Sequence, residues 1–121
     1  MKINNCTPKE LALLLLSRSN CKIQVAAVLS DSYGIFSWGW NSGPRDHNHV
    51  KGVHAETHAF SRANPKRLKG ATLTVAARRK KSESQILARP CEKCTPLIKK
   101  HKIKIIEYTT PNDTWAVEIW D

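Results

Sequence analysis

One histidine, two cysteines and one glutamate have the types and spacing of a metal-dependent hydrolytic site. His54 lies two residues before Glu56, and Cys91 and Cys94 form a C-x-x-C pair further along the chain. An imidazole and two thiolates supply three zinc ligands and leave the fourth tetrahedral position for water, as in catalytic zinc sites. The Glu56 carboxylate can approach that water without being a ligand itself.

Two helix starts are needed to present these side chains. One expected helix opens at His54-Ala55-Glu56 and another at Pro90-Cys91-Glu92-Lys93-Cys94. In the first turn of a helix, the partial positive charge and the free N–H groups favour the thiolate form that binds metal. We therefore expect both cysteines to lie in the first turn of their helix.

Apolar periodicity predicts the elements around the two helix starts. The helices are expected from Pro8 to about Ser19, from His54 to about Asn64 and from Pro90 to about Lys100, and the strands at 22–29, 35–41, 71–77, 103–108 and 115–120. Thr7 and Glu10 form a capping box for the first helix. The strand–helix–strand–helix–strand passage implies parallel pairing with helices covering the sheet. The 121 residues fit one domain spanning 1–121, without a repeat or linker.

The pattern H-x-E followed by P-C-x-x-C resembles the signature of the zinc-dependent cytidine and deoxycytidylate deaminase superfamily. Here 34 residues lie between Glu56 and Cys91. The resemblance covers most of the chain and implies an α/β fold, a three-layer α/β/α sandwich with a mixed five-stranded sheet. It also implies a hydrolase that converts cytosine to uracil and releases ammonia, with a role in nucleotide metabolism.

The resemblance also implies roles for individual residues. One zinc ion per chain would be held by His54, Cys91 and Cys94, and Glu56 would move protons between water and base. A binding module without catalytic activity is disfavoured, because all four of these residues are present.

Substrate contacts follow from the same resemblance. Asn41 ends a strand in an element similar to the family's G-x-N, whose asparagine contacts the sugar or base of the substrate. Backbone groups near Ala55 would hold the base edge. Trp40, next to Asn41, is a candidate for stacking on the base, although aromatic residues on strands are usually packing residues.

Other interpretations of the same residues are less favoured. A metalloprotease motif needs its glutamate directly after the first histidine, so His58 is interpreted as a helix-packing residue. A thioredoxin-like C-x-x-C would leave the histidine and glutamate unexplained. His101, seven residues after Cys94 and about 10 Å along the helix axis, is a less favoured fourth ligand of a structural zinc site. His47 and His49 are interpreted as exposed loop residues.

The charge of the chain favours an anionic partner. Lys and Arg number 20 against 10 Asp and Glu, a formal net charge of +10, and most of the excess lies in residues 62–104. Arg79 and Lys80 in a basic loop, and Arg89 before the Pro-Cys, are expected near the pocket mouth, where they suit phosphate recognition.

These charges favour a phosphorylated substrate over a neutral nucleoside. The short chain, without a recognisable appended binding module, favours a small-molecule nucleotide such as dCMP or CMP, whereas the basic segment 62–104 favours nucleic acid. The alternative is nucleic-acid binding, with cytosine in single-stranded DNA or RNA as the target. Adenosine in tRNA is less favoured, because relatives with that activity often carry Glu where this chain has Arg89.

The remaining expectations concern location and assembly. Four cysteines do not suggest a disulfide framework, and no apolar run approaches the roughly 20 residues needed to cross a bilayer. We therefore expect a soluble, cytoplasmic protein that does not enter membranes. Relatives acting on free substrates commonly form dimers or larger assemblies, so a homo-oligomer is consistent with the resemblance.

Overall fold

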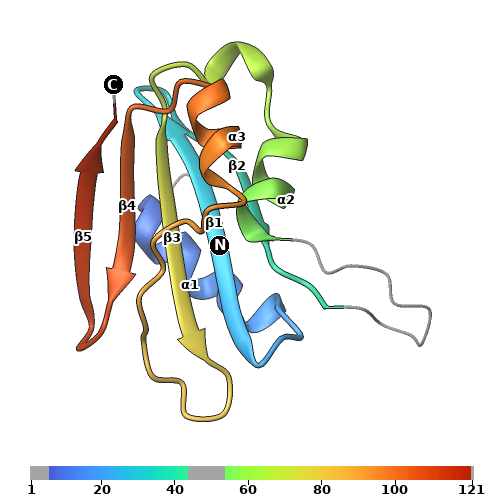
Figure 1. Cartoon of the computed structure of the whole chain (residues 1–121), viewed down its shortest axis with the longest axis vertical. Coiled ribbons are helices and arrows are strands. Elements are labelled where there is room, and N and C mark those ends of the chain that lie inside the picture. The colour runs from blue at the N-terminus through green and yellow to red at the C-terminus, as the bar shows by residue number, and fades with distance from the viewer. Residues whose placement is uncertain (1–5, 44–53, 121) are drawn as a thin grey trace.

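The computed structural model describes residues 6–43 and 54–120. Its helices are α1 (Pro8–Leu15), α2 (Ala55–Arg62) and α3 (Thr95–Lys100), with short 3-10 turns η2 (Leu16–Arg18) and η3 (Pro65–Arg67). Its strands are β1 (Ile23–Asp31), β2 (Gly34–Trp40), β3 (Thr72–Arg79), β4 (Ile105–Thr110) and β5 (Thr114–Ile119) (Figure 1). Every expected strand is present, with ends within two residues of the prediction. His47 and His49 lie outside the described residues.

The five strands form one mixed sheet in the order β2-β1-β3-β4-β5. β1 pairs antiparallel with both β2 and β3, β3 pairs parallel with β4, and β4 pairs antiparallel with β5. The expected parallel pairing is therefore confirmed for β3 and β4. It is wrong for β2 and β3, which run in the same direction but are separated by β1.

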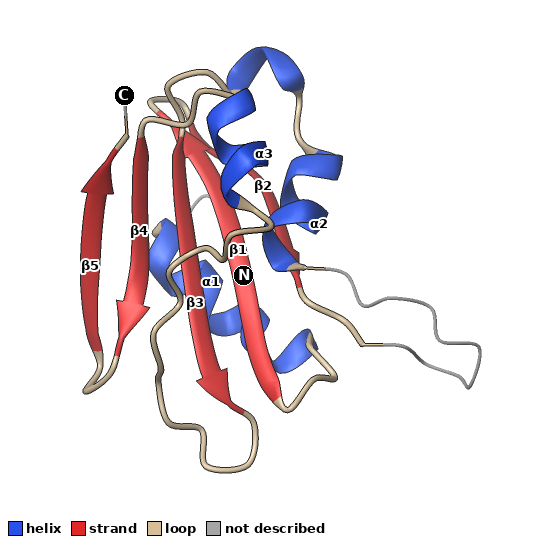
Figure 2. Cartoon of the chain, in the orientation of Figure 1, coloured by secondary structure: helices blue, strands red, loops and turns tan. Residues whose placement is uncertain are grey.

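Helices cover both faces of this sheet, α1 on one side and α2 with α3 on the other (Figure 2). Alternate residues of β1 enter the two resulting cores. Ala26 and Val28 pack in the cluster of α1, whereas Ala27 and Leu29 pack in the cluster of α2 and α3. The α/β/α sandwich implied by the resemblance is confirmed.

The capping box at α1 is confirmed. The Glu10 backbone N–H donates to Thr7 Oγ1 over 3.1 Å, and the Thr7 backbone N–H donates to Glu10 Oε1 over 3.2 Å. The α-helix itself ends at Leu15 and continues as η2 to Arg18. None of the described helices combines the length and apolar character needed to span a membrane.

The position of α2 depends on a close approach to β2 at Gly39. A Cβ atom at Gly39 would lie 2.6 Å from the backbone nitrogen of Ala59 and 2.9 Å from the carbonyl oxygen of Ala55. Nearby, Ser37 Oγ donates to the Ala59 carbonyl oxygen over 2.6 Å. β2 thus sets the height of α2 above the sheet, and with it the position of the first turn of α2.

We expect Gly39→Ala to destabilise the fold. The added methyl would collide with the backbone of α2, and overpacking of this kind typically costs about 1–3 kcal/mol. The urea unfolding midpoint should fall. Gly43→Ala is the matched control, because its Cβ would meet the nearest atom, Cys21 Sγ, at an ordinary 3.7 Å. Equal midpoints for the two variants would contradict the close approach.

Candidate metal centre and adjoining pocket

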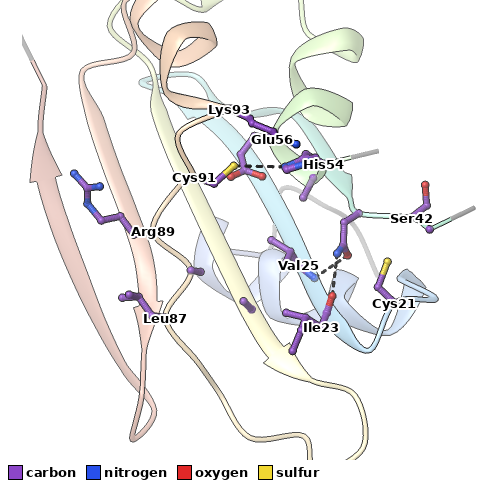
Figure 3. Close-up of a pocket in the computed structure, with 15 residues that line it drawn as sticks. Cys21, Ile23, Val25, Ser42, His54, Glu56, Leu87, Arg89, Cys91 and Lys93 are labelled. Carbon is purple, nitrogen blue, oxygen red and sulfur yellow. Dashed lines mark hydrogen bonds between the residues drawn. The ribbon is translucent and has the colours of Figure 1, made fainter. Parts of the chain in front are cut away.

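The possible metal-ligand atoms of His54, Cys91 and Cys94 all lie within 4.8 Å of one another. Figure 3 shows His54 and Cys91 facing each other in front of the sheet. His54 Nδ1 lies 3.7 Å from Cys91 Sγ and 3.6 Å from Cys94 Sγ, and the two sulfur atoms are 3.8 Å apart. The structure thus brings together the two halves of the sequence pattern.

This triangle has the dimensions of a tetrahedral zinc site. Zn–S bonds of about 2.3 Å and Zn–N bonds of about 2.0–2.1 Å imply edges of about 3.8 Å between sulfurs and about 3.5 Å between sulfur and nitrogen. The three separations match these edges within about 0.2 Å. In the described part of the chain, no fourth His, Cys, Asp or Glu joins the group. His101 is instead stacked on Phe60, with ring centroids 5.2 Å apart.

The expected helix start at the cysteines is wrong. α3 begins at Thr95, so Cys91 lies in a preceding turn and Cys94 occupies the N-cap position. The Cys91 carbonyl oxygen accepts hydrogen bonds from the backbone N–H groups of Cys94 and Thr95, both over 3.1 Å, which closes the turn. Pro96 then suits the first turn of the α-helix.

The surroundings of Cys94 favour its protonated form when no metal is bound. Burial, followed by the nearby Glu56 carboxylate and by Cys91, raises the pKa of the Cys94 thiol to about 12. Neither neighbour carries the positive charge that would favour a thiolate. A metal ion would therefore have to displace the proton as it binds, which makes metal binding pH-dependent.

Glu56 is a buried carboxyl in the first turn of α2, only 5% exposed. Figure 3 shows it beside His54 and Cys91. Its burial raises its pKa, which its own backbone N–H and the charge of His54 partly offset. A carboxyl group with a raised pKa next to a metal-ligand cluster is suited to exchange protons at that cluster.

A cavity of about 900 Å³ opens beside this group. It is lined by Cys21, Ile23, Val25, Asn41, Ser42, Gly43, His54, Ala55, Glu56, Ala77, Leu87, Ala88, Arg89, Cys91 and Lys93. Most of the apolar residues among them come from β1, β3 and the segment before Cys91. His54 and Glu56 come from the start of α2, and Cys91 and Lys93 from the turn before α3. An apolar cavity with a few convergent polar groups is typical of small-molecule sites.

Asn41 lines the cavity, but its side-chain amide is already hydrogen-bonded to β1 and to Ser19, which precedes β1. Asn41 Oδ1 accepts from the Val25 backbone N–H over 2.9 Å and from Ser19 Oγ over 2.6 Å. Asn41 Nδ2 donates to the Ile23 carbonyl oxygen over 2.9 Å. The amide thus fixes the start of β1 under the cavity.

Trp40 does not line the cavity. Successive residues of a strand point to opposite faces, and Trp40 packs against the cluster of α1. Its ring meets the edge of His58 at 4.8 Å between centroids, and its backbone N–H donates to His58 Nδ1 over 3.2 Å. These contacts confirm His58 as a packing residue.

The basic residues expected at the pocket mouth lie in different places. Arg79 and Lys80 line a neighbouring cavity of about 1090 Å³, together with Lys22 and Lys81. Ile23 lines both cavities, so the two adjoin. Arg79 is paired directly with Ile23 across β1 and β3, which places its side chain on the same face of the sheet as the pocket floor.

Arg89 lines the first cavity, but its guanidinium points away from Cys91 (Figure 3). Nε donates to Glu118 Oε2 over 2.7 Å, and a second nitrogen donates to Glu118 Oε1 over 3.2 Å. Glu118 lies on β5, 29 residues after Arg89 in the chain, and no pattern of neighbouring residues predicts a contact between the two.

Sequence reasoning missed two other residues that line the cavity. Lys93 stands inside the C-x-x-C motif, so the motif itself could have placed it there. Cys21, which precedes β1, is only partly buried and lines the cavity.

Comparisons with known proteins agree with this geometry. The family model described as "Cytidine and deoxycytidylate deaminase zinc-binding region" matches residues 4–110. The fold is similar to that of a cytidine deaminase from Burkholderia pseudomallei, with TM-score 0.68 and 19% identity over 93% of this chain and 89% of that one. A cytidine deaminase from Mycobacterium leprae is similar with TM-score 0.56 and 17% identity, over 92% and 88%. No curated protein sequence matches the chain.

We expect Cys94→Ser to lose bound zinc, because a hydroxyl replaces one of the sulfur donors. Zinc content after gel filtration, measured by atomic emission, checks this. Cys21→Ser is the matched control, since Cys21 lines the same cavity without joining the His–Cys–Cys group. Zinc retained in the Cys94 variant at the level of the control would rule out the ligand set.

Proposed function

Because the chain belongs to the cytidine and deoxycytidylate deaminase family, whose members are zinc-binding deaminases, we propose that it hydrolyses cytosine to uracil and ammonia on a phosphorylated substrate such as dCMP or CMP. The observation that carries the proposal is the buried Glu56 carboxyl beside the triangle of His54, Cys91 and Cys94. A single domain would contain the whole site.

The metal would be held by His54, Cys91 and Cys94, one ion per chain. When bound, zinc acts as a Lewis acid that lowers the pKa of water toward 7. The triangle of these three side chains supports zinc because its edges fit a tetrahedral site with one position left open.

Glu56 would carry the protons of the reaction. Its carboxylate takes a proton from the attacking water and delivers it to N3 of the ring as the water oxygen bonds to C4. The second water proton then follows through Glu56 to the exocyclic amine, which leaves as ammonia. Burial supports this role, because a raised pKa lets the carboxyl give back the proton that it takes.

The cavity supports a base as the occupant. Val25 and Ala77 provide an apolar floor on which a flat ring can lie. Ala55 is the first residue of α2, so its N–H has no carbonyl partner within the helix and can hold the base edge. The Ala88 backbone N–H is bonded to the Thr109 carbonyl oxygen over 2.9 Å, which fixes the opposite wall.

Lys93 is the cation best placed to receive a phosphate. It lines the cavity, and among the described residues it has no ion-pair partner, whereas Arg89 is paired with Glu118. A single ammonium group on the rim suits the one phosphate of a mononucleotide.

A second function, deamination of cytosine in single-stranded nucleic acid, is favoured by the adjoining basic cavity. Its four cations, Lys22, Arg79, Lys80 and Lys81, are more than a mononucleotide needs, and they lie next to the first cavity. A strand with its target base in the first cavity could extend its backbone along the second.

We expect Glu56→Gln to lose at least about 100-fold in ammonia release, the lower bound for removal of a general acid–base group. Its zinc content and unfolding midpoint should stay unchanged, because the amide has the same shape. Glu92→Gln, which alters an exposed glutamate between the two cysteines, serves as control. Turnover of the Glu56 variant at the wild-type rate would remove Glu56 from its proposed role.

We expect dCMP to exceed deoxycytidine in kcat/KM by about 10-fold or more, because a charge-assisted hydrogen bond contributes about 1.5–3 kcal/mol. Lys93→Gln should remove most of this preference, and Lys99→Gln, on the exposed face of α3, should not. Equal activity on the two substrates would argue against phosphate recognition.

Single-stranded DNA and RNA, assayed at two salt concentrations, separate the two proposed functions. Oligonucleotide activity that falls steeply with salt, and that depends on Arg79 and Lys80, would replace the mononucleotide proposal by the nucleic-acid one.

A further inference from the structure

Cys91 is carried by a segment with few backbone attachments. Ala88 donates its backbone N–H to Thr109, and the next backbone hydrogen bond is accepted by the Cys91 carbonyl itself. Between them, Arg89 and Pro90 make no backbone hydrogen bond to the described residues. Pro90 has no N–H to donate, although its side chain is buried. The main directional link between this stretch and the sheet is therefore the side chain of Arg89.

The Glu118 carboxylate is held in position for the Arg89 side chain by two further hydrogen bonds. Besides its two hydrogen bonds from Arg89, it accepts one at Oε2 from the Tyr108 hydroxyl over 2.6 Å and one at Oε1 from Trp120 Nε1 over 3.2 Å. These donors, the guanidinium first, lower the pKa of the Glu118 carboxyl to about 2. Tyr108 on β4 and Trp120, directly after β5, thus orient the charged Glu118 carboxylate. The carboxylate in turn orients the Arg89 guanidinium.

We propose that Glu118 is a positioning residue of the metal centre: through Arg89 it holds the segment that carries Cys91, and so the Cys91 sulfur, in place for the metal. The proposal rests on the ligand set of the proposed function. It assigns Arg89 a role different from phosphate binding, because two of its hydrogen bonds hold the guanidinium against Glu118 on β5, away from Cys91 (Figure 3).

Cys91 is the ligand that needs this support. Cys94 is 2% exposed and packed in the core of α2 and α3, whereas Cys91 is exposed and lies outside any helix or strand. The core fixes Cys94 without help. Partners of this kind, which orient a ligand without touching the metal, commonly contribute 10- to 100-fold in metal affinity.

The test compares Glu118→Gln, Arg89→Gln and the double variant by competition for zinc against a colorimetric chelator. Each single variant should weaken zinc binding by about 10-fold, the lower end of the usual range, because the ion pair is partly exposed to solvent. The double variant should be no weaker than either single one. Arg89→Lys should fall between wild type and Arg89→Gln, since it keeps the charge but loses the second hydrogen bond.

The control is Glu107→Gln. Glu107 is also an ion-paired glutamate on the β4–β5 hairpin, but it accepts from Thr74 Oγ1 and pairs with Lys9 on α1, on the opposite face of the sheet. Its loss should leave zinc affinity unchanged, even if it lowers the unfolding midpoint of the metal-free protein. This comparison separates a local effect on the ligand from a general loss of stability.

Kinetics at saturating zinc give a second readout. If Glu118 acts through Cys91, the KM for dCMP stays at the wild-type value in all variants. Unchanged zinc affinity in both single variants would overturn the proposal. So would a KM for dCMP that rises several-fold in Arg89→Gln and falls in Glu118→Gln, because Arg89 would then be a phosphate contact with which Glu118 competes. A wild-type protein that binds no zinc would instead overturn the proposed function itself.

Discussion

The close approach of α2 to β2 at Gly39 is the constraint on which the site depends. A side chain at this position would meet backbone atoms of α2 within 3 Å, so only glycine lets the helix settle at its observed height. That height sets where the N-cap His54 and the buried Glu56 stand above the sheet. The metal triangle closes only because α3, packed on the same face, brings Cys94 to the matching height.

Charge is used in two different ways in this chain. Arginines largely stabilise the fold: Arg67 pairs with Asp31 through two hydrogen bonds of 2.7 Å, Arg89 pairs with Glu118, and Arg78 donates to Gln24. The lysines that line the cavities have no such partners among the described residues. The ion pairs cancel within the net charge of +10, so that charge is carried by other cations. Of these, Lys93 and the four cations of the adjoining basic cavity line or adjoin the first cavity.

Local patterns predicted most of the fold but not its long-range order. The alternation of apolar and polar residues identified all five strands, and the capping box identified the start of α1. Both patterns depend only on residues close together in the chain. The insertion of β1 between β2 and β3 was missed, since strand order depends on which edges meet. The start of α3 was also missed: the turn that the Cys91 carbonyl closes uses the same residues as a first helical turn would.

The sequence by itself determined the chemistry of the candidate metal site, because zinc selects its ligands by donor type and the two short motifs supply donors of those types. Tertiary structure decided the roles of the residues around them. Asn41, Trp40 and Arg89 all stand next to the motifs or the pocket in sequence, yet the amide is bonded to β1, the indole packs under α1 and the guanidinium is held by β5. Each of these contacts depends on a partner far away in the chain. A polar side chain bonds to, and an aromatic side chain packs against, whichever partner the fold brings within reach.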